Sequence, residues 1–439
     1  MRTREATLRR LRERLAKDDQ TDSGRCGRDV EDSPILNGSV PERDVNESVT
    51  PSTPIAHPPN KAPACSAATP PSTQPVAVTA EKTHEDAALD SNDEEAEASL
   101  LNAYGQLRLC RTLGENLLGT KVVPLSETSW LVARVCLAYQ AYNTPSHRSR
   151  FSHYLGQALD LYKWRLQRGQ IHDDDMLVTG LLLCTVSIST LLLWTIHLSG
   201  LETMITERGP TAMQHDSLTV WVVEGAGLLD LPGATLGRRN PCRRIWSRLV
   251  APLARGGIEP VSGLPRSLLD IIAKLGEGQN VKPQLLDWTP DVKAEHSLQY
   301  PFWEAFRLTI LLAQHASREV SGSSDNVQSA ETDSLVMRIL SCVKMLRDTT
   351  DDSFQIPLRD CVLWPLFTAA LHTDGGTSTR TLLTKEYQAF LDRRNKLVDR
   401  TAWSILQEVW ARRDMNSTLH PLELANEFTY DMGIELHLY

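Results

Sequence analysis

The sequence predicts an all-α fold, in which a multi-helix domain of antiparallel helix pairs over residues 99–439 follows a disordered N-terminal region over 1–98. From residue 99 onward, apolar residues recur at spacings of three and four, the period of a helix face that packs on a core. No segment shows the repeated Val, Ile and Thr alternation of a sheet strand. The first 98 residues contain no Phe, Tyr or Trp, so they cannot bury enough apolar surface to offset the entropy of ordering.

The N-terminal region begins with a basic segment and ends with an acidic one. Within residues 1–20, leucines stand at spacings of three and four at Leu8, Leu11 and Leu15, which predicts an amphipathic helix with a solvated basic face. A sharper alternative is a nuclear-import signal or a DNA phosphate contact, made by Arg9, Arg10, Arg12 and Arg14. Residues 81–98 are interpreted as an acidic linker, because the acidic run that ends them is not interleaved with the aromatic residues and leucines that an activation segment would use.

The first helices of the domain have recognisable ends. We expect one helix from about residue 100, a second from 130 that Ser126 opens, and a third from 151 that stops at Gly169, a residue suited to a left-handed cap. Asp173 to Asp175 should open the next helix, since carboxylates suit the positive end of the helix dipole. Another helix should run over 194–207 and end at Gly209-Pro210.

The remainder of the chain changes character twice. Glycine and proline interrupt residues 225–300, which predicts short helices and loops there. Longer helices are then expected at 302–318, 330–347, 358–372, 379–395 and 399–412, with a mobile polar loop at 321–326. The apolar stretch 176–200 is rich in hydroxyl side chains, so it is interpreted as a buried core helix rather than a membrane span.

Composition excludes several classes of site. The formal net charge is -9, which gives no general attraction to nucleic acid. The eight cysteines include no C-x-x-C pair, which argues against a disulfide framework and a structural zinc site and favours buried thiols. The residues provide no P-loop, G-x-S-x-G or H-E-x-x-H motif. We therefore predict no catalytic residue, no metal and no cofactor.

Several short motifs in a fixed order carry a resemblance to a known family. Trp194, His197, Leu198 and Gly200 are followed by Arg208 and Gly209, then by Leu363-Trp364-Pro365-Leu366-Phe367, and finally by Glu408, Trp410, Arg412 and Arg413. Together they resemble the fungal-specific transcription factor domain, the helical regulatory region of fungal zinc-cluster transcription factors. That region normally follows a six-cysteine, two-zinc DNA-binding module, and the sequence contains no such module.

The motif residues themselves indicate architecture rather than chemistry. Trp194, Trp364 and Trp410 offer large apolar surfaces for a core, and His197 stands one turn after Trp194 as a helix-contact residue. We expect Gly200 to allow a close helix approach, Arg208 to bond the carbonyls at its helix end, with Gly209 closing that helix, and Pro365 to occupy a first turn. The residues that would bind an effector are not predicted.

The resemblance implies a nuclear transcription regulator, controlling a metabolic or secondary-metabolite gene cluster. Expected partners are the transcription machinery or a related zinc-cluster factor, together with a small-molecule effector; no membrane is expected. DNA binding by this chain alone should be weak and without sequence preference. The alternative is a non-DNA-binding adaptor or inhibitor that pairs with a full-length zinc-cluster factor, and an α-helical enzyme is a third, less favoured interpretation.

Overall fold

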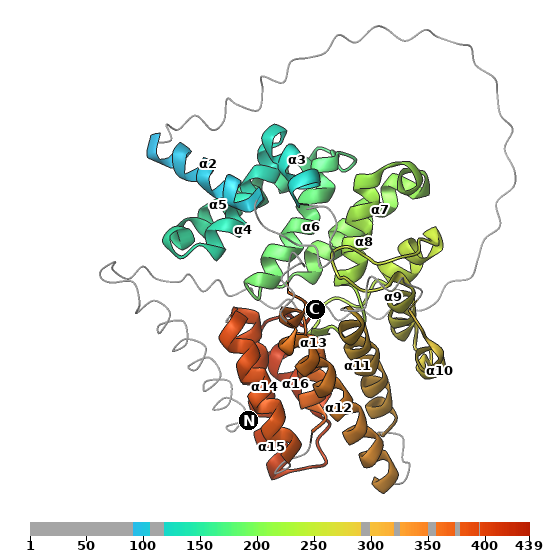
Figure 1. Ribbon diagram of the computed structural model, residues 1–439. Helices are drawn as coiled ribbons and strands as arrows, with labels where there is room; N and C mark the ends of the chain where they lie inside the picture. Colours follow the sequence, from blue (N-terminus) through green and yellow to red (C-terminus); the bar gives the residue numbers. More distant parts are fainter. Residues whose placement is uncertain are drawn as a thin grey trace, which may run out of the picture.

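The computed structural model describes residues 91–105, 118–290, 299–319, 325–349, 357–373, 378–394 and 396–439. Over these ranges the chain consists of α-helices joined by short π- and 3-10 helices, with one small sheet (Figure 1). The predicted all-α class is therefore confirmed. The basic segment 1–20 and the rest of the N-terminal region up to residue 90 lie outside the described residues, as do positions 321–324 of the predicted polar loop.

A first helical group occupies the upper part of Figure 1. It contains α2 (Ser91–Gly105), η3 (Leu118–Val122), α3 (Val123–Thr128), α4 (Trp130–Asn143), η4 (Pro145–Arg150), α5 (Phe151–Gln167), α6 (Asp174–Ser189), α7 (Thr195–His215) and α8 (Ser217–Leu229). Helix α6 is its centre, since α4, α7 and α8 all pack against it.

A second helical group forms the lower part of Figure 1. It contains α11 (Tyr300–Glu319), α12 (Asp325–Asp348), η9 (Leu358–Asp360), α13 (Leu363–Leu371), α14 (Ser378–Arg394), α15 (Leu397–Met415) and α16 (Pro421–Met432). Between the groups run β1 (Thr235–Leu236), η5 (Trp246–Val250), η6 (Ala251–Leu253), α9 (Arg266–Ala273), η7 (Lys274–Glu277) and α10 (Lys282–Asp287). One hydrophobic core extends through both groups.

Helix starts and stops agree with the sequence in several places and differ in others. Helix α5 ends at Gln167, and Gly169 adopts the left-handed conformation expected of its cap, with φ 72°. Ser129, rather than the predicted Ser126, caps α4, because its hydroxyl accepts the Val132 N–H. Ser126 lies inside α3 and bonds the carbonyl of Val123 instead.

The predicted boundary between linker and domain is wrong at residues 91–98, which belong to α2. The reason is a tertiary ion pair: Glu97, an expected linker residue, binds the buried Arg134 of α4 at 2.5 Å. Leu100 and Tyr104 of the same helix are buried, each with 3% of its surface exposed. An acidic sequence therefore becomes helical where a buried cation on the neighbouring helix takes up its charge.

The region 225–300, which we expected to consist of short helices and loops, begins inside a packed helix. Gly225 and Gly227 both belong to α8. An added β-carbon would come within 3.0 Å of Leu181 at Gly225 and within 3.1 Å of Trp246 at Gly227. These residues permit α8 to approach α6 and η5 closely, which is the role that the sequence had assigned to Gly200.

The chain also forms a two-stranded antiparallel sheet that the sequence analysis did not predict. Strand β2 (Leu436–His437) pairs with β1, with Thr235 opposite His437 and Leu236 opposite Leu436. Each strand has two residues, too few to produce a detectable alternation over a longer segment. Because β1 follows the first helical group and β2 follows the second, this sheet ties the two groups together.

No helix in the described ranges is long and apolar enough to cross a membrane. The apolar stretch 176–200 forms most of α6 and the start of α7, and its residues Met176, Leu177 and Leu183 are fully buried. The interpretation as a core helix is therefore confirmed for residues 176–189, whereas Leu192 and Leu193 are exposed in the non-helical segment between α6 and α7.

Candidate functional site

The first family motif lies at the junction between the two helical groups. Trp194 is fully buried, and its carbonyl accepts the N–H groups of His197 and Leu198 that open α7. Its ring packs edge-on against His437, 5.2 Å between centroids. Within the described part of the chain, the indole N–H of Trp194 has no hydrogen-bond partner. His197 is half-buried one turn later, and burial lowers its pKa.

The rest of this motif departs from the expected roles. Gly200 is exposed, and an added β-carbon there would meet nothing within 4 Å, so the predicted close helix approach is wrong. Gly209 does interrupt α7, with φ 76° and ψ 170°. Arg208 does not bond the carbonyls of its own helix end in the contacts observed. It binds the carbonyl of His172 and, at 2.8 Å, the carboxylate of Asp174, so it joins α7 to the start of α6.

The second family motif reaches the same junction from the other side. Trp364 is buried with 2% exposure, and Pro365 is the third residue of α13, the expected first-turn position. Trp410 is also buried but lies elsewhere, on α15, where its indole N–H donates to the carbonyl of Ala370 at 2.9 Å. The structure thus brings Trp194 and Trp364 toward one place and leaves Trp410 away from it.

Two residues of the last segment connect Trp194 to Trp364. The His437 ring, already against Trp194, lies 6.3 Å from the Tyr439 ring, and the Tyr439 ring lies 6.2 Å from the Trp364 ring, all edge-on. Phe306 of α11 closes the cluster at 5.4 Å from Tyr439. Edge-to-face pairs at these distances are favourable beyond their buried area. The two family motifs are therefore in indirect contact through residues that follow them in the sequence.

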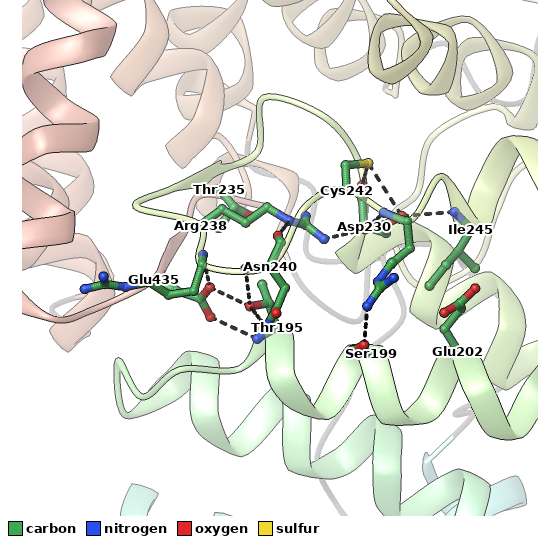
Figure 2. Close-up of polar contacts among 12 residues, drawn as sticks. Thr195, Ser199, Glu202, Asp230, Thr235, Arg238, Asn240, Cys242, Ile245 and Glu435 are labelled. Atoms are coloured by element: carbon green, nitrogen blue, oxygen red, sulfur yellow. Dashed lines mark hydrogen bonds and ion pairs between the residues drawn. The ribbon is translucent and has the colours of Figure 1, made fainter. Parts of the chain in front are cut away.

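A buried carboxylate next to these rings holds three segments together (Figure 2). Glu435 is fully buried and accepts from the Thr195 N–H at 2.9 Å, the Thr195 hydroxyl at 2.6 Å and the Arg239 N–H at 2.5 Å. The Thr195 hydroxyl in turn accepts from the Asn240 side chain at 3.0 Å. The start of α7, the loop after β1 and the segment before β2 therefore share one hydrogen-bond network.

A second carboxylate fixes the loop between β1 and η5. Asp230, with 2% exposure, binds Arg238 at 2.5 Å and accepts the Ile245 N–H at 2.9 Å and the Arg243 N–H at 3.1 Å (Figure 2). The Arg243 side chain reaches Ser199 on α7. Because backbone N–H groups at both ends of this loop bind carboxylates, the loop is held against α7 in one arrangement.

A cavity of about 260 Å³ lies beside the junction. Its walls come from the ends of α4 and α6, from η4, from the connection between α14 and α15, and from β2 and the residues after it. The charged side chains that line it are Arg148, Arg394, Lys396, Arg400 and Asp399. Asp399 is fully buried and pairs with Arg394 at 3.1 Å. Burial raises the pKa of Asp399, and Arg394 and Lys396 act against that rise.

The sequence analysis did not single out these junction and cavity residues. One signal was available, namely the cations Arg393, Arg394, Lys396 and Arg400 within eight positions. Among the described residues, no group of three or more His, Cys, Asp or Glu side chains could hold a metal ion. The free cysteines at 136, 184, 342 and 361 are buried, and Cys242 is half-buried. The four predicted arginines at 9, 10, 12 and 14 lie outside the described residues.

Comparison with known proteins gave one family. A family model described as "Fungal specific transcription factor domain" matches the chain twice, over residues 122–280 and 279–432. The first match covers most of the first helical group and the segment after it up to η7, and the second covers α10 and the second helical group. No curated protein and no solved structure matched the chain.

Proposed function

The chain belongs to the family of the fungal-specific transcription factor domain, and from this premise we propose that it regulates a metabolic or secondary-metabolite gene cluster in the nucleus. The observation that carries the proposal is the extent of the match, which runs from residue 122 to 432 and includes both helical groups. The regulatory element is therefore the whole domain, rather than one helical group attached to an unrelated one.

The junction suggests how such a domain acts. The two helical groups meet through a small sheet, an aromatic cluster and the network around Glu435. These contacts involve short segments: the two strands, the residues next to them and the start of α7. A change at this junction would shift one group relative to the other and alter the surfaces offered to the transcription machinery or to a related zinc-cluster factor. Packed interfaces of this kind tend to have a few discrete arrangements, which is what regulation requires.

Contact with DNA is proposed to be indirect or weak for this chain alone. The net charge of -9 opposes attraction to phosphates. Any binding through Arg9, Arg10, Arg12 and Arg14 should be independent of sequence and should fall steeply as salt rises. A mobility-shift titration of the purified chain at 50 and 200 mM salt measures this. A sequence-selective complex that survives at 200 mM salt would contradict it.

A gene deletion tests the proposed function directly. Loss of the chain should change transcript levels of a limited, co-located set of genes, and chromatin immunoprecipitation of the tagged chain should recover their promoters. Fluorescence of the same tagged chain should be nuclear. Unchanged transcripts combined with a cytoplasmic signal would refute the regulator.

One additional strain distinguishes the hypothesis of a regulator from that of an adaptor or inhibitor. Fusion of the chain to an unrelated DNA-binding domain should change expression of a reporter if the helical domain carries regulatory activity itself. If promoter recovery instead requires a particular full-length zinc-cluster factor, and the fusion blocks that factor's target genes, the chain is an adaptor or inhibitor.

A further inference from the structure

We propose that the loop between β1 and η5, together with the start of α7 beside it, is a docking surface for an acidic amphipathic helix of a partner protein. The loop is rich in arginine, and apolar side chains are exposed next to it. Binding depends on this surface alone, whereas its regulatory consequence rests on the function proposed above.

Charge is the first argument. Residues 238–255 contain six arginines and no aspartate or glutamate. Four of these arginines lie in the loop 237–245, which within the described ranges bonds two carboxylates, Asp230 and Glu435. The loop therefore has an excess of positive charge in a chain whose net charge is -9. Such a local excess attracts and orients a partner of the opposite sign.

Three of the four loop arginines have no carboxylate partner for their side chains in the described part of the structure. The Arg239 guanidinium donates to the carbonyl of Tyr430 at 2.7 Å, and the Arg243 guanidinium donates to the hydroxyl of Ser199 at 2.6 Å. Both acceptors are uncharged, so these bonds orient the two side chains without neutralising them. Arg244 is exposed, and within the same ranges its side chain forms neither a hydrogen bond nor an ion pair. A carboxylate from outside could therefore pair with each of the three.

The loop arginines follow one face of α7. Three residues of that face meet the loop segment (Figure 2), namely Thr195, Ser199 and Glu202. The first binds Glu435, which also accepts the Arg239 N–H, the second bonds Arg243, and the third pairs with Arg248 at 3.0 Å. These seven residues of helix span about 10 Å. Acidic side chains three or four positions apart on a partner helix recur about every 5–6 Å, so two such spacings match the row.

Exposed apolar side chains beside the row are the second argument. Ile196, near the start of α7, is 62% exposed, and Leu192 and Leu193 are exposed in the segment before it. Tyr430 of α16 is 56% exposed, and the Arg239 guanidinium lies over its ring, 3.5 Å from the centroid. Exposed apolar groups with charged groups at their edge are typical of protein interaction sites.

Two unusual backbone conformations border the same surface. Leu191, with φ 59°, precedes the exposed leucines, and Arg244 has φ 56°. The left-handed region is disfavoured for residues with a β-carbon, and residues held there cluster at functional sites. Their positions agree with a binding role for this part of the junction.

The apolar component favours a protein helix over nucleic acid. Contacts to phosphates would use the arginines and leave Leu193, Ile196 and Tyr430 uncovered. An amphipathic helix could cover these side chains with its apolar face while the acidic residues at the edge of that face reach the arginines. Because Ile196 belongs to the first helical group and Tyr430 to the second, one bound helix would contact both groups.

Binding is tested by fluorescence anisotropy of labelled synthetic peptides added to the full chain. The probe is a helix-forming peptide of about 18 residues, with leucines three and four positions apart and glutamates at the edges of the leucine face. Its controls are a scrambled peptide of the same composition, the same peptide with Gln in place of Glu, and a DNA duplex of about 18 base pairs. We expect the probe to bind more tightly than all three, and less tightly at 200 than at 50 mM salt.

Each other outcome overturns the proposal in a different way. Equal binding of the scrambled peptide would show that only charge is recognised, and equal binding of the Gln peptide would show that charge is not. Tighter binding of the duplex would assign the surface to nucleic acid. No binding of the probe would remove the docking surface itself.

Charge variants locate the site. Arg243→Gln/Arg244→Gln should weaken probe binding about fivefold or more, and Arg244→Gln alone about twofold, because exposed charges each contribute modestly. The single variant removes no contact observed within the protein, so it should keep the unmodified urea midpoint. The matched control is Lys163→Gln/Arg168→Gln, which removes two exposed cations beside the exposed Trp164 on α5. Equal affinities of the charge variants and this control would overturn the assignment to the loop.

Apolar variants test the second component. Leu193→Gln/Ile196→Gln should also weaken binding about fivefold or more, because both side chains lose apolar surface that the probe would bury. An unchanged affinity would overturn the amphipathic character of the partner. The oligomeric state of the full chain is measured alongside by analytical ultracentrifugation. A dimer that becomes monomeric in Arg243→Gln/Arg244→Gln would assign the surface to a second copy instead.

The regulatory consequence is measured separately in cells. If the proposed function is correct, the Arg243→Gln/Arg244→Gln strain should change transcript levels of the target genes, while the Lys163→Gln/Arg168→Gln strain should not. Loss of probe binding with unchanged transcripts would retain the docking surface and refute its regulatory role.

Discussion

Emptying the Trp194 site should destabilise the junction more than most single substitutions could. The side chain has no exposed surface, packs against His437, and stands at the start of α7. Trp194→Ala should lower the free energy of unfolding by about 3–5 kcal/mol, the usual cost of removing a large aromatic ring from a core. A typical domain has about 5–15 kcal/mol in total, so much of the variant should be insoluble or degraded in cells.

A pair of milder substitutions tests the contribution of the indole N–H. The N–H of Trp194 has no hydrogen-bond partner in the described part of the structure, whereas that of the equally buried Trp303 donates to the carbonyl of Gly263 at 2.7 Å. Replacement by Phe removes the same volume at both sites. Trp194→Phe also removes an unsatisfied donor, while Trp303→Phe leaves a carbonyl unpaired. The second variant should therefore be less stable than the first by about 1–3 kcal/mol.

Urea unfolding followed by far-ultraviolet circular dichroism measures these differences through the midpoint at constant slope. Equal midpoints for the two Phe variants would refute the hydrogen-bond argument. An unchanged midpoint for Trp194→Ala, together with lost transcriptional output, would show that Trp194 is a partner-binding residue and that its structural interpretation is wrong.

Further substitutions probe the junction, the glycines and acid stability. Thr195→Val and Glu435→Gln should each lower the free energy of unfolding by about 1–3 kcal/mol. Because the two side chains share a 2.6 Å hydrogen bond, their double-mutant cycle should show a coupling energy of about 0.5–3 kcal/mol. Additive losses of stability would contradict the network. Gly237→Ala should lower the urea midpoint, because φ is 65° and a β-carbon would come within 2.6 Å of a neighbouring hydroxyl. Gly200→Ala should raise it by the equivalent of about 0.5–1 kcal/mol, because the position is helical and open. Burial lowers the pKa of His372 to about 3. Between pH 6.5 and 3 the unfolded chain therefore binds more protons than the native one, and stability should fall as the pH drops below about 6.5. His372→Gln should reduce this dependence of the urea midpoint on pH.

Features that depend on neighbouring residues could be predicted from the sequence. Gly169 follows one periodic apolar stretch and Asp173 precedes the next. From these two residues we predicted the end of one helix and the start of another, and the structure contains both, as the end of α5 and the start of α6. Their physical causes act within a few residues of chain, so the sequence records them directly. The use of Asp174 was less predictable, because its carboxylate binds Arg208 from a different helix rather than capping its own.

Features that depend on distant residues could not be predicted in the same way. Gly225 and Gly227 were expected in loops, since their close neighbours Leu181 and Trp246 are brought to them by tertiary packing. The pairing of β1 with β2 joins segments about two hundred positions apart and leaves almost no local pattern. The candidate site depends on that pairing, because His437 lies both at the junction and in the cavity wall.

The order in which the ribosome releases the two strands has a consequence for folding in the cell. Leu436 is added 436 − 236 = 200 residues after its partner Leu236. At about 5–20 residues per second, translation of that interval takes roughly 10–40 s. During this time the first helical group can form, yet Thr195 and Asn240 lack the Glu435 carboxylate that later joins them. Chaperones that recognise incomplete chains would have tens of seconds to engage the nascent protein before Glu435 and β2 complete the junction.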